Sequence, residues 1–110
     1  VGFYVYPNAS DSLVSTTALQ ANTWYHIALS RVSGTTRLFI NGVLEASTAT
    51  GLTLTPDPLH APTLGGYWQI TGGYESAGWF NGFIDDFRVT KGIGRYTANF
   101  TPPTAAFPTY

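Results

Sequence analysis

The residues best suited to chemistry in this 110-residue chain lie in the stretch 67–79. This stretch holds two Tyr and two Trp among glycines that leave the backbone free to bend. A sugar presents an apolar C–H face ringed by hydroxyls, so a flat aromatic ring can stack on the face while an amide or a carboxylate binds the edge. Trp68 and Tyr74 are therefore the candidate stacking residues, with Gln69 and Glu75 as candidate edge partners.

The same stretch has a second interpretation. Tyr and Trp are enriched at protein–protein interfaces, so Trp68 and Tyr74 equally suit packing against a neighbouring subunit. In that interpretation Tyr67 and Trp79 end strands and cover the core. The sequence leaves both interpretations open.

Asp85 and Asp86 form the one adjacent acidic pair. Neighbouring residues of a strand point to opposite faces, so the two cannot make a two-carboxylate site by themselves. Either one can join backbone carbonyls around Ca²⁺, which takes about six to eight oxygen ligands. Asp85 and Asp86 are thus the candidate metal ligands, and no other cofactor is expected. The alternative is that Asp86 pairs with Arg88, two positions along on the same face.

The residue patterns of a hydrolase are missing. A retaining glycosidase needs two carboxylates about 5–5.5 Å apart, and no strand here carries acidic residues at alternating spacing. The Gly-x-Ser-x-Gly elbow of serine hydrolases is also absent from the sequence. His26 and His60 have no acidic residue at a ligand-like offset, so a structural role is expected for both. We therefore expect a non-enzymatic protein.

The composition of the chain excludes further classes of binding partner. Charged residues make up 10% of the chain, and the formal net charge is −1. This balance offers no electrostatic attraction for a phosphate backbone, so nucleic-acid binding is not expected. No apolar run approaches the roughly 18 residues of a membrane span, so no membrane insertion is expected. The absence of Cys excludes a disulfide framework.

The elements that would position these residues are short strands. The stretch 23–32 is the strongest, and because both of its faces are mainly apolar it predicts a central strand covered on both sides. A turn at 33–35 leads into a second strand at 36–40. Asn41 and Gly42 then predict a two-residue type I′ turn, in which both residues need a positive φ.

That turn fixes the pairing of the strands on either side of it. Ile40 comes to face Val43, and Phe39 comes to face Leu44. Leu38 would face Glu45, which is a poor match. The mismatch indicates either a frayed edge at Glu45 or a loop longer than two residues.

The rest of the chain shows weaker signals. Strands are expected at 2–6, 12–17 and 63–67, and a second strong strand at 80–90, whereas 47–62 is broken by three prolines. Residues 91–96 could form one helical turn, although its two glycines weaken it by about 1 kcal/mol each. The tail 97–110 contains three further prolines and is expected to be irregular, with Arg95 docking it.

These short strands predict one all-β domain over 1–110, an antiparallel two-sheet sandwich. The expected inward-facing residues are Ile27, Leu29, Leu38, Ile40, Phe83, Phe87 and Val89.

Three stretches resemble a known family: TWYHIALSR at 23–31, LFING at 38–42 and FNGFIDDFRV at 80–89. Together they are similar to the concanavalin A-like, laminin G-like jelly-roll domains. Within these, the closing phrases KGIGRYT at 91–97 and FTPP at 100–103 resemble the subgroup of bacteriophage tail and virion proteins.

The resemblance implies a two-sheet jelly roll of the lectin type, whose members bind glycans or proteins through loops at one rim. It implies a lectin-like binding module of a virion (a tail fibre or capsid decoration) or of a cell-surface assembly. The alternatives are a purely structural or oligomerisation module of a viral particle and a fragment of a carbohydrate-active enzyme. Family domains carry further strands before the point that matches Val1, so we expect a C-terminal portion of a longer protein that is oligomeric or part of a larger assembly.

Overall fold

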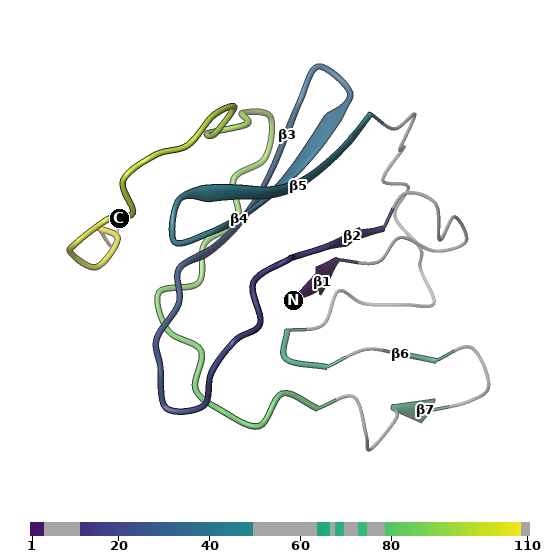
Figure 1. The fold of residues 1–110 in the computed structure, drawn as a ribbon, viewed down its shortest axis with the longest axis vertical. Helices are drawn as coiled ribbons and strands as arrows, with labels where there is room; N and C mark the ends of the chain where they lie inside the picture. Colours follow the sequence, from purple (N-terminus) through teal and green to yellow (C-terminus); the bar gives the residue numbers. More distant parts are fainter. Residues whose placement is uncertain (4–11, 50–63, 67, 70–72, 75–78, 109–110) are drawn as a thin grey trace. The chain divides into compact units, whose positions relative to one another are not determined.

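The computed structural model describes residues 1–3, 12–49, 64–66, 68–69, 73–74 and 79–108 (Figure 1). In this part of the chain every strand pairs antiparallel and no residue is helical. The all-β prediction is therefore confirmed. The helical turn expected at 91–96 is wrong, because Gly92 has a φ of 86°, which lies outside the right-handed helical region. Nothing in the described ranges could serve as a membrane-spanning helix.

The chain divides into two compact units, which are considered separately. The first unit comprises Val1–Leu52 and Val89–Tyr110, and the second comprises Thr53–Arg88. Both termini therefore belong to the first unit, and the aromatic stretch 67–79 belongs to the second.

A three-stranded sheet forms the first unit, with β3 (Ile27–Val32), β4 (Thr35–Ile40) and β5 (Val43–Ala49) in that order. Two-residue turns join the strands. Ser33 and Gly34 have φ values of 48° and 79°, and Asn41 and Gly42 have φ values of 50° and 78°. Positive φ at both central positions is the type I′ geometry, whose twist suits a hairpin. The turn predicted at Asn41 and Gly42 is confirmed.

The structure avoids the mismatch at Glu45 neither by a frayed edge nor by a longer loop. Ile40 pairs with Val43 and Phe39 with Leu44, as predicted, but Leu38 pairs with Ala46. Glu45 is therefore an extra residue in β5, a β-bulge that removes the unfavourable pairing.

A second, two-stranded sheet in the same unit joins β1 (Gly2–Phe3) to β2 (Leu13–Val14). Strand β2 contacts β4 and β5. The buried apolar residues of the described chain are Leu13 on β2 and Leu38, Phe39 and Ile40 on β4. Since consecutive residues of a strand point to opposite faces, β4 is covered on both sides.

The predicted core is only partly correct. Leu38 and Ile40 are buried as expected, but Ile27 and Leu29 are 46% and 44% exposed. The face was predicted correctly, because Ile27 pairs with Ile40 and Leu29 with Leu38. The position in the sheet was wrong: among the described strands, β3 lies at the edge and not at the centre. The covering layer reaches β4 and leaves this row of β3 open.

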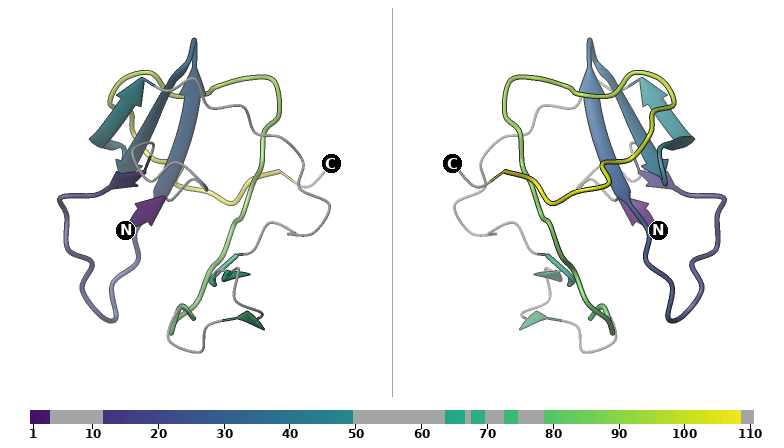
Figure 2. Two further views of the ribbon diagram at one scale, coloured as in Figure 1. Left: turned by 90° about the vertical axis from the view of Figure 1, so that its right-hand side faces the viewer. Right: turned by 90° about the vertical axis from the view of Figure 1, so that its left-hand side faces the viewer.

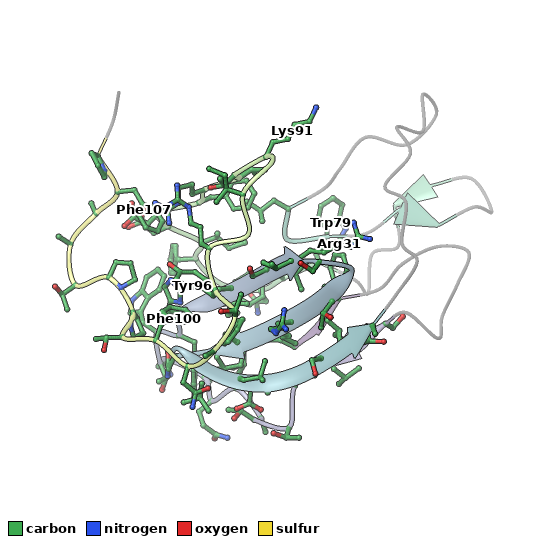
Figure 3. The ribbon with its side chains drawn as sticks, turned by 90° about the horizontal axis from the view of Figure 1, so that it is seen from above. Arg31, Trp79, Lys91, Tyr96, Phe100 and Phe107 are labelled. Carbon is green, nitrogen blue, oxygen red and sulfur yellow. The ribbon has the colours of Figure 1, made fainter. Side chains whose placement is uncertain are left out.

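The opposite face of β4 is covered by the C-terminal segment 94–102, which runs along the sheet in Figures 2 and 3. Tyr96 and Phe100 stack on one another with ring centroids 3.6 Å apart. Both rings meet Phe39 edge-on, at centroid distances of 6.1 Å and 5.4 Å. Edge-to-face and offset-stacked rings add about 0.5–1.5 kcal/mol per pair beyond the area they bury.

Backbone contacts hold the same segment in place. The Tyr96 amide donates to the Ser30 hydroxyl at 3.1 Å, and the Phe100 amide donates to the Gly42 carbonyl at 2.9 Å. Arg95, which was expected to dock the tail, instead donates to the nearby Thr90 hydroxyl at 3.0 Å. The neighbouring aromatic residues dock the tail. Its irregular path, without helix or strand over 97–108, is as predicted.

In the second unit, a short hairpin pairs β6 (Trp68–Gln69) with β7 (Gly73–Tyr74). The strand expected at 63–67 is not formed over its described part, 64–66. The strand expected at 80–90 is wrong too: no residue there is in a strand, and Asp86 has a left-handed φ of 53°. Side chains therefore cannot alternate evenly through this stretch.

The inward positions predicted on the stretch 80–90 fail with the strand. Phe83 is 85% exposed and Phe87 is 63% exposed, and Val89, which belongs to the first unit, is exposed as well. Burial requires a neighbouring layer as well as an apolar side chain, and the described residues supply no layer here.

Candidate functional site

The hairpin β6–β7 brings two of the predicted site residues together. Its register pairs Trp68 with Tyr74 and Gln69 with Gly73. Directly opposed residues of an antiparallel pair lie on the same face, with Cβ atoms about 4.5–5.5 Å apart. The two candidate stacking residues, six positions apart in the sequence, are thus opposite one another across the hairpin. Glu75, the fourth predicted site residue, lies outside the described part of the chain.

The backbone beside this hairpin is supported by aromatic packing on glycines. The Phe80 amide donates to the Gly65 carbonyl at 2.7 Å. The Trp79 ring lies where a side chain on Gly66 would meet it, 3.0 Å from an added Cβ. Trp79 therefore packs against the backbone of Gly66, but about half of it stays exposed, which differs from the core-covering role of the second interpretation.

Asp85 and Asp86 are both exposed. The Asp86 amide donates to the Asp85 carboxylate at 2.8 Å, which stabilises the left-handed turn at Asp86. Calcium needs several further oxygen ligands. Within the described residues, no three His, Cys, Asp or Glu side chains come together. The two aspartates thus have a local structural role here, and calcium binding stays a prediction.

Among the described acidic residues, Glu45 has the most extensive hydrogen bonding. Its carboxylate accepts from the amides of Thr16 and Thr17 at 3.0 Å and 2.9 Å and from both of their hydroxyls, that of Thr17 at 2.7 Å. These hydrogen bonds, led by those from the Thr16 and Thr17 side chains, lower the pKa of Glu45 to about 2. Glu45 is therefore ionised at neutral pH and unsuited to donate a proton, and it fastens the loop after β2 to the bulge in β5.

His26 lies in a structural setting. Its backbone amide donates to the Asn41 side chain at 2.9 Å, and its carbonyl accepts from the Asn41 amide at 2.8 Å. Its ring meets Phe100 edge-on with centroids 5.6 Å apart. These contacts join the chain before β3, the Asn41 turn and the docked tail. They favour the structural role expected for His26, whereas His60 lies outside the described residues.

Sequence reasoning missed two features of the first unit. One is the Glu45 contact with Thr16 and Thr17, for which the Leu38–Glu45 mismatch was the available signal. The other is the exposed Trp24, with 68% of its surface open. Trp24 was assigned to a covered strand, but that strand begins only at Ile27.

Comparison with known proteins identifies a matching family and a similar solved structure. The family model for the concanavalin A-like lectin/glucanases superfamily, Laminin_G_3, matches residues 1–92. No curated protein matches the chain. Among solved structures, an S-layer domain-containing protein from Clostridium thermocellum is similar, with 27% sequence identity and a TM-score of 0.53. The match covers 73% of this chain and 39% of that one, so the chain spans well under half of the solved structure.

Proposed function

The chain belongs to the concanavalin A-like lectin/glucanase superfamily, and from that premise we propose that it is a non-enzymatic binding module which recognises a glycan or a protein through the β6–β7 hairpin. The pairing of Trp68 with Tyr74 is the observation that carries this proposal. Aromatic residues at opposed positions of a hairpin suit the apolar part of a ligand site, and Gln69 is the next residue of the same strand.

The placement of the three acidic residues that the structure describes, Glu45, Asp85 and Asp86, supports a non-enzymatic role. The superfamily name covers glucanases as well as lectins, and a retaining glycosidase needs two carboxylates that face one sugar. Glu45 is occupied by Thr16 and Thr17. Asp85 and Asp86 are consecutive, and one of them accepts a hydrogen bond from the other's amide. A fragment of a carbohydrate-active enzyme, with its acids elsewhere in a longer chain, is the alternative.

The setting of the module is an extracellular assembly. Similarity to an S-layer domain-containing protein supports a cell-surface location. The phrases at 91–97 and 100–103 support the other setting expected from the sequence, a virion tail fibre or capsid decoration. Both settings present the module to glycans and proteins outside a cell.

Glycan-array binding of the full 110-residue chain tests the proposal. We expect Trp68→Ala and Tyr74→Ala to weaken binding by at least about 30-fold each, since anchor residues contribute about 2 kcal/mol or more. Trp24→Ala is the matched control, because it removes an exposed Trp from the other unit. Equal loss in all three variants, or unchanged binding in both hairpin variants, would refute the assignment.

A second assay addresses catalysis. We expect no glycoside hydrolysis by the chain. Turnover that disappears in Asp85→Asn or Asp86→Asn would refute the non-enzymatic assignment.

A structural role in an assembly is the second candidate function. It is favoured by the large apolar side chains that the stretch 80–88 exposes. A module that serves only as a subunit contact would bind no glycan and would lose its partner when these side chains are changed.

A further inference from the structure

The chain contains two Asn-Gly dipeptides, Asn41–Gly42 and Asn81–Gly82. Asparagine is chemically labile when glycine follows it, because the glycine amide nitrogen can attack the side-chain carbonyl carbon and no Cβ hinders the approach. This attack requires rotation about the bond between the Asn Cα and its backbone carbonyl carbon. The reactivity of each dipeptide therefore depends on how firmly the fold holds its backbone.

The dipeptide Asn41–Gly42 is held on both sides. The Asn41 amide donates to the His26 carbonyl at 2.8 Å, and the Asn41 Oδ1 accepts from the His26 amide at 2.9 Å. Gly42 is buried, and its carbonyl accepts from the Phe100 amide at 2.9 Å. Both residues of the dipeptide have the positive φ of a type I′ turn. Attack by the Gly42 nitrogen thus requires this turn to open first.

The dipeptide Asn81–Gly82 has the opposite setting. Both residues are exposed, and neither lies in a strand or a helix. Within the described ranges, no hydrogen bond holds the Asn81 side chain or the Gly82 backbone. The Phe80 ring would lie 2.8 Å from a Cβ added to Gly82, but this ring is a side chain that can turn away. The backbone between Asn81 and Gly82 is therefore free to rotate into the reactive geometry.

From this contrast we propose that Asn81 is a site of spontaneous deamidation and that the β4–β5 turn protects Asn41 from the same reaction. The Gly82 nitrogen forms a bond to the side-chain carbonyl carbon of Asn81, and the side-chain nitrogen leaves as ammonia with the proton that the Gly82 nitrogen gives up. Water then opens the cyclic imide at either carbonyl, which gives aspartate or isoaspartate at position 81. Solvent water is the one co-reactant.

The reaction changes both charge and backbone length in the second unit. Each conversion replaces a neutral amide by a carboxylate, so the formal net charge of −1 becomes one unit more negative. Isoaspartate also lengthens the backbone by a methylene directly after Phe80, whose amide donates to the Gly65 carbonyl at 2.7 Å. The reaction itself does not depend on binding by the β6–β7 hairpin.

Incubation of the full 110-residue chain in mildly alkaline buffer tests the proposal. Peptide mapping by mass spectrometry detects the replacement of NH₂ by OH, and isoaspartyl methyltransferase labels the isoaspartate product. In the folded chain, Asn81 should convert at least about tenfold faster than Asn41, since only Asn41 must wait for local opening. In urea the two rates should agree within about threefold, because glycine follows both residues.

Asn81→Gln is the control, because the longer glutamine side chain closes a less favourable ring. It should remove the early deamidation and leave the conversion of Asn41 unchanged. Circular dichroism checks that the variant has the same fold as the parent chain.

Three results would overturn the proposal. One is equal conversion of Asn41 and Asn81 in the folded chain. Another is conversion of Asn81 that is at least about tenfold slower in the folded chain than in urea, which would mean that this dipeptide is covered in solution. The third is early deamidation in Asn81→Gln that matches the parent chain.

Discussion

Strand β4 and the apolar segment 80–88 are similar as sequences and opposite as structures. Both contain closely spaced large apolar residues and an Arg. In β4, Leu38, Phe39 and Ile40 are almost fully buried, whereas Phe83 and Phe87 are 85% and 63% exposed. β4 has a strand on each side and a layer on each face. The stretch 80–88 has a left-handed residue, Asp86, and no strand pairing. Apolar character alone does not bury a side chain, since burial needs neighbours on the correct face.

The largest effect should come from the centre of the first unit. Phe39→Ala removes a ring with no exposed surface that meets both Tyr96 and Phe100. We expect it to lower the free energy of unfolding by about 3–5 kcal/mol. Phe83→Ala is the matched change in the apolar segment and should alter it by no more than about 0.5 kcal/mol in the monomer. Urea denaturation at low protein concentration measures both, and equal losses would remove the contrast.

Within the sheet, a pair of opposed leucines sharpens the comparison. Leu38→Ala should cost about 2–5 kcal/mol, because Leu38 is buried. Leu29, its partner on β3, is 44% exposed, so its truncation removes less buried apolar surface. Leu29→Ala should therefore lower the free energy of unfolding by roughly half as much. The same denaturation assay distinguishes them. A cost for Leu29→Ala as large as that for Leu38→Ala would mean that the open face of β3 is covered in solution.

Alanine substitutions at two glycines distinguish the cost of backbone strain from the cost of displacing the tail. Gly42 has a φ of 78°, and an added Cβ would lie 1.9 Å from the Phe100 carbonyl oxygen. Gly42→Ala should therefore cost on the order of 2 kcal/mol and displace the tail. Gly92 has a similar φ of 86° but nothing within 4 Å, so Gly92→Ala carries only the left-handed strain, about 1 kcal/mol.

Hydrogen exchange at the Phe100 amide reports the position of the tail. We expect faster exchange in Gly42→Ala and unchanged exchange in Gly92→Ala. Equal exchange in the two variants would show that Gly42 does not control docking.

The smallest expected effect is a loss of stability at low pH. The pKa of Glu45 is lowered from 4.5 to about 2 in the folded chain. A group with a lowered pKa stabilises the fold above its unfolded pKa, and this contribution is lost as the pH falls. Stability should thus decline as the pH falls from 4.5 to about 2, and Glu45→Gln should remove this part of the decline. Thermal unfolding measured across that range tests it; an unchanged acid profile in Glu45→Gln would contradict the assignment.

Much of the first unit could be predicted from the sequence because its signals are local. Asn41 and Gly42 determine their own turn through positive φ, and the alternation of 36–40 determines which residues share a face. Trp68 and Tyr74 were chosen by residue type, and their cross-strand pairing follows from a short loop within one hairpin. Such features depend on contacts a few residues apart in the sequence.

The remaining features were decided by the tertiary structure. Leu29 stays partly exposed because β2 contacts mainly β4 and β5. Glu45, the bulge residue, binds Thr16 and Thr17, almost thirty positions away. The exposure of Phe83 and Phe87 depends on which strands lie beside them. These outcomes depend on contacts distant in sequence, which a periodic pattern cannot encode, because the pattern specifies a face and its tertiary neighbours decide whether that face is buried.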